Sequence, residues 1–165
     1  MEILSKPITD LASDPANLRL HGEVNIQAIK ASLQRFGQQK PIVIDGAGVV
    51  RAGNGTLEAA RLLGWTEIDV VVTELEGSEA TAYAIADNRT SELAEWDDVA
   101  LAQQLKALEE VDQGLLDAIG FDAEDIANLA IHLDPEFSPG DEEEQGKLDE
   151  KNPITCPECG NEFTP

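Results

Sequence analysis

Two glycines at the start of an expected helix have the residue types and spacing of a phosphate-binding loop. Residues Arg51–Thr56 follow a short apolar stretch, with Asn54 between Gly53 and Gly55. Such a turn lets backbone N–H groups approach an anion, and the helix dipole adds about half a positive charge. Thr56 offers a hydroxyl or a helix cap, and Arg51 offers a cation. The segment predicts a phosphate site, with an ordinary strand-to-helix turn as the alternative.

An acid, an amide and a guanidinium lie together at Asp87–Arg89, at the expected end of a helix. The oxygens of Asp87 and Asn88 suit Mg²⁺, and the planar fork of Arg89 suits phosphate. Asp87 is also the candidate catalytic acid of a metal-dependent enzyme. The alternative is that these side chains close the helix and bond to each other.

A third group of polar residues lies early in the chain, at Asn17–His21. Arg19 is either a ligand contact or part of a loop salt bridge. We interpret His21 as a surface imidazole rather than a catalytic residue.

The elements that must position these residues alternate between helix and strand. Apolar residues at helical spacing predict a helix from Ile26 to Phe36, capped by Asn25 and ended by Gly37. Strands are expected at 41–44 and 49–51, joined as a hairpin by a turn at 45–48. A helix over 56–63 follows the glycine loop, then a strand over 68–72 and a helix from Ser78, its cap, to Asp87.

From residue 97 onward the pattern is helical only. Three short apolar stripes predict three helices, with Asp98 and Asp122 at expected N-caps. Helices this short need packing partners, so residues 96–133 are expected to form a helical extension that serves as a scaffold or a partner surface.

The charge of the chain limits its partners. The net charge is −22, which excludes a surface built for general adhesion to DNA or membrane phosphates. Eight of the eleven basic residues lie in residues 1–95, so DNA binding is expected only through a local basic region. The residues of that region are Arg19, Arg35, Lys40, Arg51, Arg61 and Arg89. No apolar run approaches the roughly 18 residues of a membrane span, and a cytoplasmic protein is expected.

The end of the chain changes composition twice. Residues 134–152 are too acidic and polar to bury a core and are expected to form a disordered linker. The tail, 153–165, contains Cys156 and Cys159 in a Cys-Pro-Glu-Cys-Gly sequence similar to half of a zinc ribbon. Zinc needs four ligands. Two chains could share one ion as a homodimer, His21 or His132 could contribute, or the knuckle binds no metal.

In order, these pieces resemble the ParB-like family, whose fold is shared by the N-terminal domain of chromosome-partitioning ParB proteins, sulfiredoxin and a free serine kinase. The resemblance covers about residues 3–97. Its motifs are Asn17–Arg19, Leu33–Ile44, Val50–Ala60 and Ile85–Arg89. Together with the segment Ser91–Asp97, the chain looks like compact phage and prophage ParB-like proteins that are often encoded near DNA methyltransferases.

The family resemblance implies a nucleoside triphosphate held at Gly53–Thr56, Mg²⁺ near Asp87 and Asn88, and a pocket lined by Gln38 to Pro41. One departure is important: partitioning proteins have Gly-Glu-Arg-Arg where this chain has Gly-Asn-Gly-Thr. The missing carboxylate and arginines put hydrolysis in doubt and weaken triphosphate binding. The helix-turn-helix of partitioning proteins also has no clear counterpart here.

The sequence therefore predicts an α+β fold: a small mixed-sheet ParB/sulfiredoxin-like domain at 1–95, then the helical extension, the acidic linker and the tail. The expected function is nucleotide binding by a regulator or adaptor of phage or prophage DNA metabolism, acting with DNA or a DNA methyltransferase. One alternative is a metal-dependent nuclease or phosphotransferase using Asp87. Another is an acidic protein-interaction module with a vestigial nucleotide pocket and a basic partner.

Overall fold

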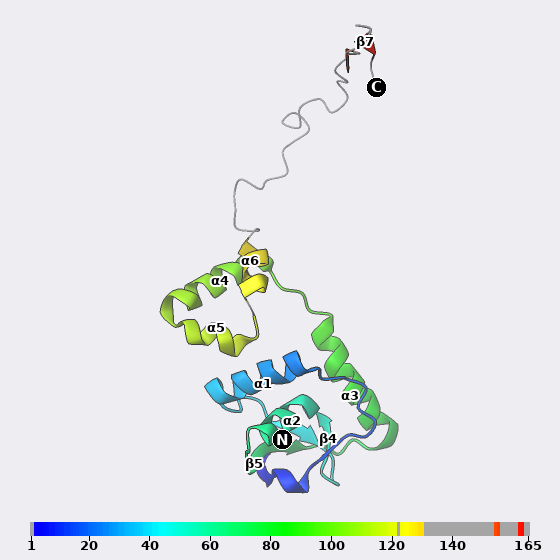
Figure 1. Ribbon diagram of the computed structural model, residues 1–165. Coiled ribbons are helices and arrows are strands. Elements are labelled where there is room, and N and C mark those ends of the chain that lie inside the picture. Colours follow the sequence, from blue (N-terminus) through cyan, green and yellow to red (C-terminus); the bar gives the residue numbers. More distant parts are fainter. Residues whose placement is uncertain (1, 122, 131–153, 156–161, 164–165) are drawn as a thin grey trace. The chain divides into compact units, whose positions relative to one another are not determined.

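A mixed five-stranded sheet is the centre of the fold (Figure 1). The computed structural model describes residues 2–121, 123–130, 154–155 and 162–163, and the chain divides into two units, 1–133 and 134–165. The strands are β1 (Ile3–Pro7), β2 (Ala12–Ser13), β3 (Ile42–Ile44), β4 (Val49–Ala52) and β5 (Glu67–Val72). Their order is β1-β5-β3-β4-β2; β1–β5 and β3–β4 are antiparallel, while β3–β5 and β2–β4 are parallel. The predicted α+β class with a mixed sheet is confirmed.

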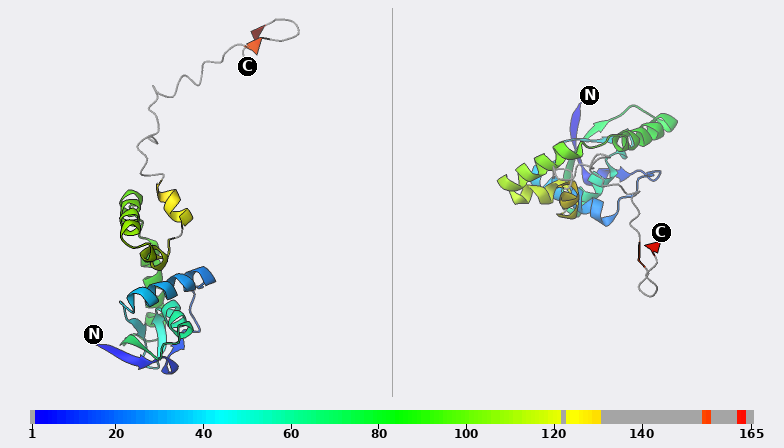
Figure 2. Two further views of the ribbon diagram at one scale, coloured as in Figure 1. Left: turned by 60° about the vertical axis from the view of Figure 1, so that its left-hand side comes forward. Right: turned by 90° about the horizontal axis from the view of Figure 1, so that it is seen from above.

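Helices surround this sheet and continue beyond it. The first unit contains η1 (Ile8–Asp10), α1 (Glu23–Phe36), α2 (Asn54–Leu62), α3 (Gly77–Glu92), α4 (Asp98–Val111), α5 (Gln113–Ile119) and α6 (Ala123–Ala130). Helix α1 packs against α2 on one side and α5 on the other, so it lies between the sheet and the later helices (Figure 2). Helix α3 is mostly exposed, with Ala80 as its buried residue.

Aliphatic side chains fill the core between the sheet and helices α1 and α2. Ile44, Leu57, Val50 and Val70 are the largest fully buried side chains. Three of them come from strands and one from α2, which fixes the start of α2 against the end of β4. The core therefore supports the glycine loop directly.

The later helices pack on the core domain through α1. Ala102 and Leu105 of α4 and Leu116 of α5 are buried. Arg35 of α1 pairs with Asp112, the N-cap of α5, at 2.6 Å. The predicted helices after residue 97 are thus present.

Several local expectations are confirmed. The 41–51 hairpin forms, and α1 ends at Gly37, whose φ of 69° favours glycine. The strand over 68–72 forms as β5.

Other local expectations are wrong. Helix α1 begins two residues before Asn25, after the N-cap Gly22. Helix α3 is capped by the backbone of Glu76 rather than by Ser78, and it runs past Asp87. The cap of α4 is Asp97, not Asp98. In each case a neighbouring residue has the extended backbone that a cap needs.

Much of the last 35 residues lies outside the described part of the chain. The acidic segment 134–152 and the cysteines Cys156 and Cys159 belong to it. The two short strands β6 (Ile154–Thr155) and β7 (Glu162–Phe163) pair antiparallel on either side of the cysteines. Within the described residues, no helix has the length and apolar character that crossing a membrane requires.

Candidate functional site

Gly53 makes the turn from β4 into α2. Its φ is 99°, in the left-handed region, and a Cβ at this position would lie 2.5 Å from Cγ2 of Ile42. Both facts require glycine, because a side chain would be strained and would collide with the buried strand β3. The glycine therefore lets the chain bend sharply against the sheet.

The turn leaves backbone donors at the start of α2. The N–H of Leu57 donates to the carbonyl of Gly53 at 3.0 Å, which is the first bond of the helix. The N–H groups of Asn54, Gly55 and Thr56 precede it, so helix geometry gives them no acceptor within the helix. These three amides are the donors that an anion would use.

A cavity of about 160 Å³, called here the glycine-loop cavity, lies beside these donors. It brings together all three polar segments singled out from the sequence. Its lining residues are Asn17, Arg19, His21, Ile29, Arg51, Ala52, Gly53, Asn54, Gly55, Thr56, Asp87 and Asn88. Most of the predicted site residues therefore lie at this one cavity although they are up to about 70 positions apart in sequence; Gln38, Pro41 and Arg89 are not among its lining residues.

A second cavity, of about 240 Å³ and called here the α3 cavity, shares lining residues with the first. The shared residues are Asn17, Arg19, Arg51, Asn54 and Asn88. The α3 cavity adds Asp14, Ala16 and Leu18 from the loop before α1, and Thr81, Ala84, Ile85, Arg89 and Glu92 from α3. A ligand can thus contact the start of α2 and one face of α3 at the same time.

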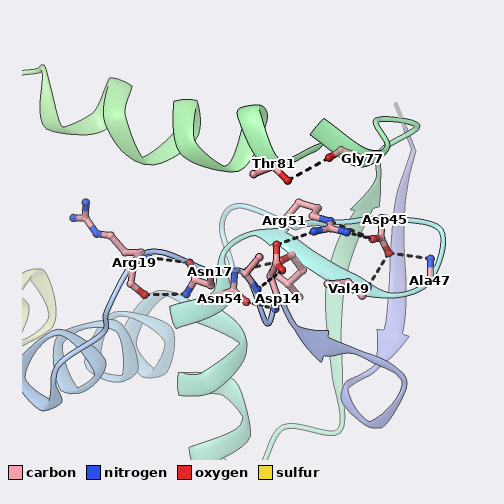
Figure 3. A network of polar contacts seen from close by, with 12 residues as sticks. Asp14, Asn17, Arg19, Asp45, Ala47, Val49, Arg51, Asn54, Gly77 and Thr81 are labelled. Carbon is pink, nitrogen blue, oxygen red and sulfur yellow. Dashed lines mark hydrogen bonds and ion pairs between the residues drawn. The ribbon is translucent and has the colours of Figure 1, made fainter. Parts of the chain in front are cut away.

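Arg51 is held by two carboxylates (Figure 3). Its guanidinium contacts Asp14 at 2.8 Å and Asp45 at 2.7 Å, and the three side chains are only 6–20% exposed. The bond to Asp45 raises the pKa of Arg51. Burial works to raise the pKa of Asp45, but amide hydrogen bonds from Val49 and Ala47 and the Arg51 contact bring it below its ordinary value. The guanidinium of Arg51 thus stays charged, and its positive charge is compensated by the carboxylates of Asp14 and Asp45.

Asn54 fastens the loop before α1 to the start of α2. Its Oδ1 accepts the N–H of Asp14 at 3.0 Å, and its Nδ2 donates to the carbonyl of Val50 at 3.2 Å. Asp14 in turn accepts the N–H of Ala16. The side chain of Asn54 thus builds the wall of the site (Figure 3).

His21 is half-buried at the site. Its Nδ1 lies 2.7 Å from Oδ1 of Asn25, and its ring lies where a Cβ of Gly55 would be. The imidazole is partly exposed, which agrees with the expectation of a surface residue, and the missing side chain of Gly55 makes room for the ring. No local sequence pattern indicates this contact.

The Asp87–Arg89 group lies within α3, which continues to Glu92, and not at the end of the helix as expected. Asp87 and Asn88 face the glycine-loop cavity, and Nδ2 of Asn88 donates to the carbonyl of Ala84 at 2.8 Å. Arg89 faces the α3 cavity and contacts Glu92, as Arg19 also does. Burial and the charge of Asp87 raise the pKa of Tyr83, one turn earlier.

Gln38 and Pro41 do not line either cavity. The side-chain amide of Gln38 bonds to both backbone groups of Asp69 in β5, each at 2.8 Å. Gln38 thus extends the hydrogen bonding of the sheet, and its assignment to a nucleotide pocket stays a prediction from the family resemblance.

Mg²⁺ fits this site only together with ligand phosphates. Among the described residues no cluster of three or more metal-binding side chains is present. Asp87 and Oδ1 of Asn88 offer one carboxylate and one amide oxygen. Such a pair is typical of Mg²⁺ sites in which waters and substrate phosphates complete the coordination.

Acids of the chain compensate part of the charge of the predicted basic region. The arginines that form ion pairs with carboxylates are Arg19, Arg35, Arg51 and Arg89. Arg61 donates to the neutral carbonyl of Leu11 at 2.7 Å, which holds its side chain but does not cancel its charge. Among the described residues, these ion pairs reduce the positive charge that could bind a phosphate backbone.

Known proteins resemble this chain in sequence and in fold. No family model matches it. It is 29% identical over 72 residues, 44% of this chain and 83% of the relative, to the ParB-like nuclease domain-containing protein YnaK of Escherichia coli. C-terminally truncated chromosome-partitioning protein ParB of Caulobacter crescentus, in complex with CTP-gamma-S, matches with a TM-score of 0.69 at 22% identity over 82% of each chain. Sulfiredoxin of Arabidopsis thaliana matches with a TM-score of 0.43 at 17% identity, covering 52% of this chain and 98% of its own.

Proposed function

The chain carries a ParB-like domain of the ParB/sulfiredoxin superfamily, and from this premise we propose that it binds a nucleoside triphosphate. The phosphates lie at the start of α2, where Gly53–Thr56 supply N–H donors, and they extend toward Arg19, Asn88 and Arg89. The observation that carries the proposal is the convergence of three separate polar segments on one pair of joined cavities.

CTP is the first nucleotide to test. The Caulobacter ParB structure that matches this fold contains a CTP analogue. Mg²⁺ would bind between the phosphates and the oxygens of Asp87 and Asn88, neutralising charge that this site, with few unpaired cations, leaves uncompensated.

Binding without turnover is the favoured outcome. Hydrolysis needs a group that activates water, and Asn54 holds the position where partitioning proteins have a carboxylate. An amide is no general base, and both ends of this one are bonded to the backbone of the chain. The ligand would then act as a signal, which suits a regulator or adaptor in phage or prophage DNA metabolism, with a DNA methyltransferase as a partner.

The test is a thermal-shift screen of CTP, ATP, GTP and ADP with and without Mg²⁺. A nucleotide that binds the folded state and not the unfolded chain raises the melting temperature, and at saturating concentrations the stabilisation grows with the logarithm of the ratio of its concentration to its Kd. We expect a triphosphate to give the largest shift and Mg²⁺ to increase it. No shift with any nucleotide would leave the acidic protein-interaction module as the better account.

An enzyme is the second candidate, favoured by the position of Asp87 in the glycine-loop cavity and by the nuclease domain in the name of the Escherichia coli relative. In this reading a divalent metal at Asp87 supports cleavage of DNA or transfer of a phosphoryl group. Metal-dependent product formation that is lost in Asp87→Asn, with the fold intact, would establish it. Saturable nucleotide binding without product would exclude it.

A further inference from the structure

Glu92 lies between two arginines at the α3 cavity. One carboxylate oxygen, Oε1, forms a close ion pair with Arg19, and the other, Oε2, contacts Arg89 at 3.4 Å. The three side chains come from two segments, the loop before α1 and the last turns of α3. One acid therefore occupies both guanidiniums at once.

These are the cations of the cavity that a ligand can reach. The third arginine of its lining, Arg51, is 20% exposed and already bonded to Asp14 and Asp45. Arg19 and Arg89 are 45% and 61% exposed, and among the described residues Glu92 is the acid that pairs with them. An anion that enters this cavity meets Glu92 in the place where its own charge would bind.

We propose that Glu92 is a specificity-determining residue that competes with the ligand for Arg19 and Arg89. Exposed ion pairs of this kind are weak, so a ligand can displace the carboxylate. The exchange is favourable for a polyphosphate, which brings several charges and can bind Arg in the bidentate way. The gain is smaller for a ligand with a single phosphate group, because one such group only takes the place of the one carboxylate that Glu92 already supplies.

This inference rests on the proposed phosphate site at the start of α2. It adds that the site selects ligands by the number of linked phosphate groups. The two cavities share Arg19 and Asn88, so a ligand that extends from one cavity into the other contacts both the α2 donors and the arginines. A monophosphate bound at the α2 donors alone does not need to displace Glu92. Removing the charge of Glu92 should therefore improve triphosphate binding and leave monophosphate binding unchanged.

The experiment is titration calorimetry of CTP, CMP and inorganic tripolyphosphate against the full chain and Glu92→Gln, at one salt concentration. Glutamine keeps the size of the side chain and removes its charge. We expect the Kd for CTP and tripolyphosphate to fall about three- to tenfold, the effect of losing two weak ion pairs, and the Kd for CMP to stay the same. Glu95→Gln is the matched control, because it makes the same change of net charge at an exposed residue outside both cavities.

A second comparison tests whether Glu92 acts on ligand binding through its ion pair with Arg19. In an Arg19→Ala background, Glu92→Gln should improve triphosphate binding less than it does in the wild-type chain, because one of the two contested guanidiniums is gone. An equal improvement with and without Arg19 would overturn the proposal, as would equal effects of Glu92→Gln and Glu95→Gln. Unchanged or weaker triphosphate binding in Glu92→Gln would also overturn it.

The probes separate this inference from the proposed function. Tripolyphosphate binding that improves in Glu92→Gln, without CTP binding, supports the role of Glu92 and refutes a nucleotide ligand. CTP binding that Glu92→Gln does not improve refutes the role of Glu92 and leaves the nucleotide site standing. Absence of binding by both probes, in the wild-type chain and in Glu92→Gln, refutes both.

Discussion

The imidazole of His21 lies directly against Gly55. A Cβ added to Gly55 would be 2.8 Å from both Cε1 and Nδ1 of His21, closer than real Cβ contacts come. The loop before α1 is thus fitted to the first turn of α2 at the point where the candidate anion donors lie. Gly55 is needed for this packing, so a large residue such as valine here would disturb α1 as well as any anion site.

Gly55→Ala should lower the free energy of unfolding by less than the roughly 1–3 kcal/mol usual for overpacking, because the added Cβ meets the ends of the His21 and Ile29 side chains, which can shift, and because alanine favours a helix over glycine by about 1 kcal/mol. His21→Ala combined with Gly55→Ala should recover part of this loss, because the ring that collides is removed. Recovery should be incomplete, since Cδ1 of Ile29 also lies 3.0 Å from the added Cβ. Urea unfolding of the two single variants and the double variant measures the coupling; strictly additive effects would contradict the contact.

Arg51→Gln should be strongly destabilising. It leaves the carboxylate of Asp14, which is 6% exposed, without its cation, and such a loss typically costs about 3 kcal/mol or more. The matched control is Arg35→Gln, which breaks an ion pair whose side chains are 46% and 41% exposed and should cost about 0–1 kcal/mol. Denaturant unfolding compares them, and similar losses would show that the network around Arg51 does not hold the loop.

The Asp45 contacts should make stability depend on pH in the acid range. The pKa of Asp45 is lowered in the folded state, so its stabilisation is fully present above its unfolded pKa of about 3.9 and is lost as the pH falls through the folded pKa. Asp45→Asn should therefore be less stable than the wild type at pH 7, by about 1.5–3 kcal/mol. The difference should shrink below about pH 4. A difference that is constant from pH 7 to pH 3 would contradict the assignment.

Local patterns were sufficient to predict the elements that carry the glycine loop. The apolar strand, the two glycines and the helical stretch after them are contiguous in sequence, and each has its own periodicity or turn residues. The same is true of the 41–51 hairpin and of the α1 end at Gly37. Strands β1 and β2 lack such a signal, because the first has mostly exposed residues and the second has only two.

The contacts that complete the site come from residues far apart in sequence. Arg51 looked like a phosphate ligand because its type and position suit one; only the fold brings Asp14, 37 positions away, to neutralise it. The pairing of Arg19 with Glu92, 73 positions apart, is likewise a product of the fold. A single sequence has no local pattern that encodes such pairs.

Thr56→Glu separates the stability of α2 from its use as an anion site. Position 56 is in the first turn of the helix, where a carboxylate interacts favourably with the helix dipole. The variant should be as stable as the wild type, or more stable by about 0.3–1 kcal/mol. Thermal unfolding without nucleotide checks this, and Thr56→Val is the control for loss of the hydroxyl alone. A clear loss of stability in Thr56→Glu would mean that the side chain clashes at this position.

Titration calorimetry of CTP with Mg²⁺ against the wild type and Thr56→Glu tests the phosphate site most directly. The site predicts saturable binding to the wild type and a Kd about a hundredfold higher, or no binding, in the variant, because a fixed carboxylate occupies the place of a phosphate. Equal affinity of the two proteins would contradict a phosphate site at the start of α2.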